Sequence, residues 1–199
     1  MIYILIFSVI SIIPCFGQDY YEYLAKGTAA FKKDNYKEAI NYYNKALALK
    51  PNSPVALMNR AAVKKRLADY KGAIADLDKS ISMDPNNANA YVHRGTSRGL
   101  SGDFKGQLQD MNKAIELKPD FEIAYVNRGM AKASLKDDKG AVLDYTKAIA
   151  LDPTDGTAYY NRARAKLRLN QKSSACADLT KARELGHPDA ENAIKLMCK

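Results

Sequence analysis

Prolines recur at a fixed interval along this chain. Pro51, Pro85, Pro119 and Pro153 follow one another at steps of 34 residues. If proline is assigned position 32 of a 34-residue unit, the units begin at Tyr20, Pro54, Ala88, Glu122 and Gly156. A fixed period of this length is typical of arrays in which each unit is one supersecondary element. The chain is therefore expected to fold by stacking similar units, since one such unit cannot bury its apolar face alone.

Each unit carries two stretches with apolar residues at helical spacing, at positions 1–14 and 18–31. Turn-forming residues separate the stretches, and Asp-Pro or Lys-Pro ends most units, which favours a helix-turn-helix. Positions 8, 20 and 27 are small in most units, and positions 4 and 24 are large. Small residues let two helices approach while the large ones fill the space between them.

This pattern resembles the tetratricopeptide repeat (TPR), which has the same 34-residue period. The resemblance covers residues 20–188 and implies an all-α, right-handed superhelical solenoid of five helix-turn-helix repeats. These repeats are residues 20–53, 54–87, 88–121, 122–155 and 156–188, and residues 189–199 are expected to form a C-terminal capping helix. The Trp that the family carries at position 4 is Tyr or Leu here.

Repeat 3 departs most from the pattern. Gln107 replaces the small residue at position 20, and the repeat contains Gly95, Gly99, Gly102 and Gly106. A glycine inside a helix costs about 1 kcal/mol relative to alanine. We therefore expect repeat 3 to be the least stable unit.

Residues 1–17 contain no charged side chain, and residues 2–13 are apolar apart from two serines. A spanning helix needs about 20 apolar residues, so this run is too short. It is typical of a secretory signal, with Cys15 and Gly17 at −3 and −1 of the cleavage site and a mature chain that begins at Gln18. The protein is thus expected to be secreted or periplasmic. A lipid anchor on Cys15 and an uncleaved anchor remain alternatives, and only these predict membrane attachment.

The segment Gly186–Asp189 combines a helix stop with an N-cap and is expected to form a turn between two helices. Cys176 lies eleven residues before position 187 of this turn, and Cys198 lies eleven residues after it. Antiparallel packing of the flanking helices would place the two thiols opposite each other. In a secreted protein this predicts a disulfide, whereas in the cytosol the thiols would stay reduced.

The TPR resemblance implies a non-enzymatic scaffold that binds polypeptides in a concave groove lined by the first helix of each repeat. Position 6 of that helix is Asn59, Asn127 and Asn161 in three repeats and His93 in another. Asn both donates and accepts hydrogen bonds, so a row of Asn could pair with the backbone of an extended peptide. The alternative is that these Asn only bond a neighbouring helix. The clamp that some family members use for terminal carboxylates of chaperones is matched here at Asn59 alone.

Four repeats carry Arg at position 7 together with Asp at position 23, and repeat 1 lacks both. Because the two residues are present together in four repeats and absent together from the fifth, we predict that they form a structural ion pair between the two helices of a repeat. The predicted pairs are Arg60–Asp76, Arg94–Asp110, Arg128–Asp144 and Arg162–Asp178. Position 26 is Lys in all five repeats, which predicts a solvated stripe on the convex face.

The net charge is +9, and residues 156–199 hold nine basic against four acidic side chains. Within the groove, Lys65 and Arg66 mark repeat 2, and Arg164 and Arg168 mark repeat 5. This distribution favours an extended peptide with acidic ends over a nucleic-acid duplex, which needs a continuous basic stripe.

No enzyme motif is present, and we expect no small-molecule substrate, cofactor or metal. Two alternatives to the groove remain open. The protein could be an accessory subunit of a cell-envelope assembly that docks through its convex face or its caps. It could also bind an anionic surface, of nucleic acid or lipid headgroups, through basic repeat 5.

Overall fold

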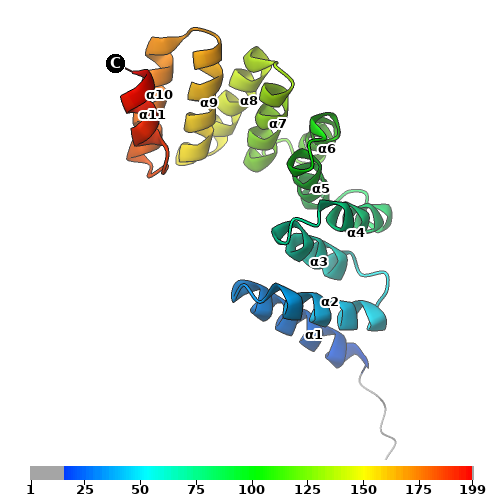
Figure 1. The fold of residues 1–199 in the computed structure, drawn as a ribbon. Coiled ribbons are helices and arrows are strands. Elements are labelled where there is room, and N and C mark those ends of the chain that lie inside the picture. The colour runs from blue at the N-terminus through cyan, green and yellow to red at the C-terminus, as the bar shows by residue number, and fades with distance from the viewer. Residues whose placement is uncertain (1–15, 199) are drawn as a thin grey trace, which may run out of the picture.

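The computed structural model describes residues 16–198, and this part of the chain is all-helical (Figure 1). Its eleven helices are α1 (Phe16–Lys32), α2 (Tyr36–Leu49), α3 (Pro54–Arg66), α4 (Tyr70–Met83), α5 (Ala88–Leu100), α6 (Phe104–Leu117), α7 (Glu122–Ser134), α8 (Asp138–Leu151), α9 (Gly156–Arg168), α10 (Lys172–Glu184) and α11 (Ala190–Met197). The predicted stretches at positions 1–14 and 18–31 agree with these helices to within about a residue in repeats 2 to 4.

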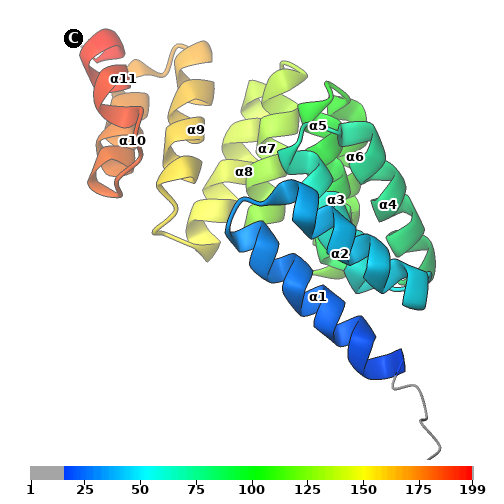
Figure 2. The same ribbon diagram turned by 60° about the horizontal axis from the view of Figure 1, so that its bottom comes forward.

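The first ten helices form five pairs, and each pair contacts the next one along the chain. The pairs stack into an arc, which the two views of Figures 1 and 2 show from different sides. In Figure 1, α3 and α5 lie toward the hollow side of the arc, and α4 and α6 lie toward its outer side. The predicted all-α solenoid is thus confirmed.

None of the helices within residues 16–198 combines the length and apolarity that a bilayer crossing requires.

Side chains cap the helices at repeated positions. Ser53, Asn87 and Asp155 accept hydrogen bonds from backbone N–H groups at the starts of α3, α5 and α9. Asp69, Asp103 and Asp137 do the same at α4, α6 and α8, where the donor is a glycine N–H three residues later. These bonds satisfy N–H groups that lack an intrahelical acceptor.

Helix α1 begins at Phe16, four residues before the predicted start of the first repeat. Repeats 2 to 5 each begin shortly after a proline, which ends the preceding helix, and in repeats 2, 3 and 5 a side chain also caps the new helix. No such stop precedes Tyr20 within residues 16–19, so the helix extends toward the N-terminus. The predicted cleavage site at Gly17 would fall inside α1, and residues 1–15 lie outside the described part of the chain.

Small side chains allow the helices to approach, as the sequence pattern indicates. Alanines at positions 20 and 27, such as Ala39, Ala73 and Ala148, are fully buried. The size of the residue at position 8 depends on the residue at position 24, because the side chain at position 24 packs against position 8. Where position 24 is Tyr, position 8 is Gly: a Cβ atom at residue 27 would lie 2.6 Å from Tyr43, and one at residue 129 would lie 2.7 Å from Tyr145.

The glycines of repeat 3 have packing roles. A Cβ at residue 95 would lie 2.3 Å from Met111, and one at residue 99 would lie 2.3 Å from the amide of Gln107. Gly102 has φ +90°, in a turn where the other repeats hold a non-glycine residue with positive φ. Gln107 is 4% exposed and donates to the carbonyl of Asn127 at 3.3 Å. The lower stability expected for repeat 3 stays a prediction.

Helix α11 closes the C-terminal end of the array. Gly186 adopts φ +79° after α10, and Asp189 occupies the N-cap position of α11, as predicted, although its side chain forms no capping bond. Cys176 and Cys198 form a disulfide, with their Cα atoms 5.7 Å apart. Ala193 and Ile194 of α11 pack with Leu179 of α10. The predicted disulfide between α10 and the end of α11 is therefore present in the structure.

Candidate functional site

The Arg residues at position 7 form ion pairs with the Asp residues at position 23 of the same repeat. Each Asp is 2–6% exposed, and each Arg donates through Nη2 to its Asp at 2.6–2.7 Å. In repeats 2, 4 and 5 the Nε atom donates to the second oxygen, so these pairs are bidentate. All four predicted pairs are formed.

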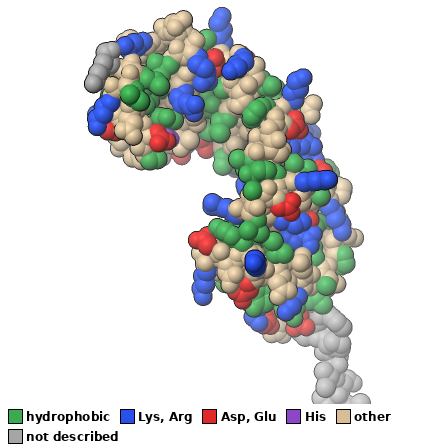
Figure 3. All heavy atoms as spheres, in the orientation of Figure 1, with side chains coloured by type: hydrophobic (Ala, Val, Ile, Leu, Met, Phe, Trp, Pro, Cys, Tyr) green, Lys and Arg blue, Asp and Glu red, His purple; other side chains and the backbone are tan. Residues whose placement is uncertain are grey.

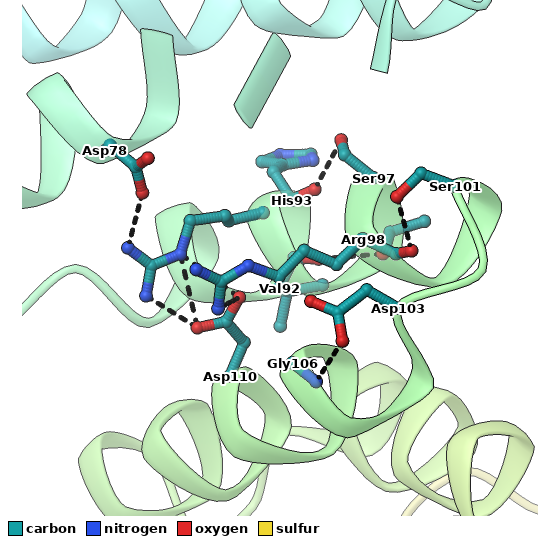
Figure 4. Close-up of polar contacts among 11 residues, drawn as sticks. Asp78, Val92, His93, Ser97, Arg98, Ser101, Asp103, Gly106 and Asp110 are labelled. Atoms are coloured by element: carbon teal, nitrogen blue, oxygen red, sulfur yellow. Dashed lines mark hydrogen bonds and ion pairs between the residues drawn. The ribbon is translucent and has the colours of Figure 1, made fainter. Parts of the chain in front are cut away.

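Each pair also has two partners that the sequence reading missed. A second cation at position 11 reaches the same Asp, through Lys64, Arg98, Lys132 and Lys166. Nη1 of each Arg donates to position 25 of the preceding repeat, which is Asn44, Asp78, Asn112 or Thr146. Figure 4 shows the network of repeat 3, where Arg98 pairs with Asp110 and where Asp78 approaches from the preceding repeat. The network therefore joins the helices of one repeat and also joins it to the previous repeat.

The Lys residues at position 26 lie on the second helices. Lys45, Lys79, Lys147 and Lys181 are exposed, and Lys113 is partly buried. Several have nearby partners, since Lys79 donates to the carbonyl of Pro51 at 2.9 Å and Lys113 pairs with Glu116 at 2.6 Å. The stripe is solvated, and its charge is partly compensated within the chain.

The hollow side of the arc contains two adjoining pockets between its first helices. One, of about 160 Å³, lies between α7 and α9 and is lined by Asn161, Arg164 and Arg168 among others. The other, of about 120 Å³, lies between α5 and α7 and includes Asn127. Both include Met130 and Ser134. Figure 3 shows hydrophobic side chains exposed on the hollow side over α3 and α5, with Lys and Arg around them.

The predicted Asn row is only partly engaged by the protein itself. Asn127 donates through Nδ2 to the carbonyl of Ile123 at 2.8 Å, a bond within its own helix. Within residues 16–198, the side chains of Asn59 and Asn161 make no hydrogen bond, and Oδ1 of Asn127 accepts none. Polar groups that face the groove without a partner remain available to a ligand.

Lys65 and His93 are two titratable groove residues in repeats 2 and 3. Burial lowers the pKa of Lys65, and the nearby charge of Arg66 lowers it further. Burial also lowers the pKa of His93, with a smaller contribution from Lys65. His93 is consequently neutral at pH 7, so its ring can donate and accept like the Asn at the same position.

The basic groove residues of repeat 5 differ from each other. Arg168 donates through Nε to Asp138 at 2.6 Å, a pair 30 residues apart that links α9 to the start of α8. Arg164 forms no ion pair within the described residues, and its guanidinium lies 5.9 Å from the ring centre of Tyr160. Arg164 is therefore the better placed of the two to bind an anionic ligand.

No three His, Cys, Asp or Glu side chains of residues 16–198 form a group suited to a metal ion.

Glu122, at the start of α7, is a further titratable residue that the sequence did not indicate. Its Oε1 atom is buried without a hydrogen-bond partner within residues 16–198. Burial and the nearby charge of Asp155 raise its pKa to about 7. Asp155 accepts from the backbone N–H groups of Thr157 and Ala158 at the start of α9, one with each carboxylate oxygen.

This environment predicts a pH-dependent stability. The folded protein holds a proton on Glu122 up to about pH 7, whereas an unfolded Glu loses it near pH 4.3. Stability should therefore fall as the pH rises through this window. We expect Glu122→Gln to raise the free energy of unfolding by about 1–2 kcal/mol at pH 8, after allowance for solvent screening, and to change little at pH 4. Urea denaturation at both pH values measures this.

Glu116→Gln is the matched control, because Glu116 is exposed and paired with Lys113. It should change stability by less than about 0.5 kcal/mol at either pH. Equal effects of the two substitutions at pH 8 would contradict the assigned environment of Glu122.

Comparisons with known proteins agree with this architecture. Family models described as tetratricopeptide repeats match residues 27–67, 55–87, 123–155 and 144–177, which together cover more than half of the chain. No curated protein sequence matches the chain.

Several solved structures share the fold. PilF of Pseudomonas aeruginosa has a TM-score of 0.81 at 18% identity, over 90% of this chain and 82% of that one. MamA from Desulfovibrio magneticus RS-1, residues 41 to the end, has a TM-score of 0.77 at 21% identity, over 85% and 96%. YrrB, described as a TPR protein with an unusual peptide-binding site, has a TM-score of 0.71 at 22% identity, over 91% and 98%.

Proposed function

Because this chain is a tetratricopeptide repeat protein, we propose that it is a non-enzymatic scaffold that holds an extended partner polypeptide in the groove of its first helices. The observation that carries the proposal is the pair of adjoining pockets at α5, α7 and α9. Asn127 lines one and Asn161 lines the other, and both keep hydrogen-bonding atoms without a partner among residues 16–198.

The chemistry of the groove suits a peptide. An Asn side chain can pair with a backbone N–H and C=O together, whatever the sequence of the peptide. Lys65 and Arg66 lie in repeat 2, and Arg164 and Arg168 line the pocket between α7 and α9, so basic groups lie toward both ends of this part of the groove. Acidic residues toward the ends of the peptide would complement this charge.

We also propose that the chain is exported, as five tandem repeats closed by the capping helix. The disulfide between Cys176 and Cys198 supports this, because such bonds persist in oxidising compartments. The uncharged, apolar segment of residues 1–17 supports it independently.

A library of acetylated, amidated nonapeptides tests the groove. The immobilised protein is incubated with the library, and bound peptides are quantified by mass spectrometry. Asn127→Ala with Asn161→Ala should lower the captured amount at least about tenfold, since two hydrogen bonds worth about 1 kcal/mol each are lost.

The matched control is Asn41→Ala with Asn192→Ala, which changes two exposed Asn on α2 and α11, outside the groove. Capture should then stay at the wild-type level. Unchanged capture by the groove variant would contradict the proposal.

Docking by the convex face or the caps is a second candidate, favoured by Leu143 on α8 and Leu196 on α11, which are 70% and 80% exposed. Isolated exposed apolar residues are ordinary on protein surfaces, so this support is weaker. If Leu143→Ser or Leu196→Ser abolished binding of an assembly partner while peptide capture by the groove was unchanged, docking by the convex face or the caps would be favoured. Binding that falls steeply with salt would instead favour an anionic surface held by repeat 5.

A further inference from the structure

The pocket of about 160 Å³ between α7 and α9 is lined by several polar side chains that have no hydrogen-bond partner within the described part of the chain. Ser134, Tyr145, Asn161 and Arg164 line it, and none of the four makes a side-chain hydrogen bond or an ion pair within residues 16–198. Polar groups that line a pocket and lack a partner in the chain can pair with water or with a ligand. This concentration distinguishes the pocket from the rest of the groove.

Tyr145 is the most informative of these residues. It is 2% exposed, and its ring lies on Gly129, which has no Cβ to displace it. Tyr43 occupies the same position in repeat 1, and there the hydroxyl is 3.2 Å from the hydroxyl of Thr28. The residue equivalent to Thr28 in repeat 4 is Met130, which cannot form that bond. The hydroxyl of Tyr145, which lines the pocket, therefore lacks the partner that Tyr43 has in repeat 1.

The charge of the pocket points to a monoanion. Arg164 has no counter-ion among the described residues, whereas Arg168 is paired with Asp138 at 2.6 Å. Burial raises the pKa of Tyr145 further than Arg168 and Arg164 lower it, so the phenol stays protonated and donates. One uncompensated guanidinium and two or three neutral donors match a carboxylate, which accepts several hydrogen bonds. A phosphate carries up to two charges, and Arg164 alone would leave one of them uncompensated.

The adjoining pocket of about 120 Å³ is apolar in its lining, with Leu100, Phe104 and Met130. Leu100 is 54% exposed and Met130 is 43% exposed, which is high for residues of this size. Because Met130 and Ser134 line both pockets, a short stretch of peptide can reach the two together.

We infer that the α7–α9 pocket binds a carboxylate of the partner polypeptide, through Tyr145, Asn161 and Arg164. The α5–α7 pocket binds a large apolar side chain a few residues away. This inference rests on the proposed function and adds the recognition motif: an acidic group close to a large apolar residue.

The test uses acetylated, amidated nonapeptides of Gly and Ser with one fixed Leu. Asp, Asn or phosphoserine is placed at each remaining position, and a further set ends in a free carboxylate. Affinities are measured by fluorescence anisotropy. Peptides with Asp near Leu should bind at least about tenfold more tightly than their Asn counterparts. The set with free ends shows whether a terminal carboxylate serves as well as a side chain.

Tyr145→Phe removes only the hydroxyl and should cancel most of the preference for Asp, while the Asn peptides bind as before. Tyr43→Phe is the matched control, because its hydroxyl pairs with Thr28 outside these pockets. Equal binding of Asp and Asn peptides would overturn the carboxylate site but leave groove binding intact. A preference for phosphoserine, or no effect of Tyr145→Phe, would also overturn it. If no peptide binds, the proposed function fails as well.

Discussion

Asp110→Ala is expected to lower the free energy of unfolding by about 3–5 kcal/mol, the usual cost of removing one partner from a buried ion pair. Asp110 is 2% exposed and accepts from both Arg94 and Arg98. Its loss leaves two partly buried guanidinium groups without their shared counter-charge, and Arg94 also holds Asp78 of the preceding repeat. Urea denaturation followed by circular dichroism measures the change.

Asp78→Ala is the matched control, since Asp78 pairs with the same Arg94 but its side chain is 51% exposed. It should cost less than about 1 kcal/mol. If Asp110→Ala costs no more than this control, the network is not structural. The Arg residues at position 7 would then have to be reconsidered as ligand contacts.

Reduction of the disulfide between Cys176 and Cys198 has the second large expected effect. The bond closes a segment of 22 residues, so its loss should lower the free energy of unfolding by about 3 kcal/mol. Helix α11 has eight residues and packs only on the end of the array, so it should loosen first. Hydrogen exchange should increase in α10 and α11 on reduction, with little change in α1–α4, because each repeat contacts mainly its neighbours.

Cys176→Ala with Cys198→Ala is the control for side effects of the reductant. The double variant should match the reduced wild type and show no further change when reductant is added. A wild type whose exchange and intact mass do not change with reductant would contradict the presence of the bond.

The sequence predicted the repeat, its helices and the Arg–Asp pairs because each depends on residues at fixed spacing within one unit. Arg94 and Asp110 are 16 residues apart, as are the other three pairs, so a two-helix unit brings them together without knowledge of the whole array. The two cysteines are similarly symmetric about one turn. The first helix was placed four residues too late, because no capping signal marks its start.

The contacts between repeats could not be read from spacing in the same way. The acceptor at position 25 of the preceding repeat depends on how two units stack. The cation at position 11, by contrast, lies in the same repeat as its Asp, 12 residues before it. Arg168 lines a groove pocket, as the spacing predicts, but its ion pair with Asp138 of repeat 4 depends on how the two repeats stack. The pKa of Glu122 is raised by burial first and then by the charge of Asp155, which lies at the next helix start across a repeat junction.

The sequence by itself determined that this chain is an array of helical hairpins with a basic C-terminal part, because the period places the same side chains in the same local environment five times. Only the tertiary structure decided which charges and hydroxyls remain free to bind. That depends on partners from other repeats: Asp138 compensates Arg168, whereas Met130 leaves the hydroxyl of Tyr145 unpaired. A polar side chain can bind a ligand only if no other side chain of the protein pairs with it, and this pairing depends on how the repeats stack.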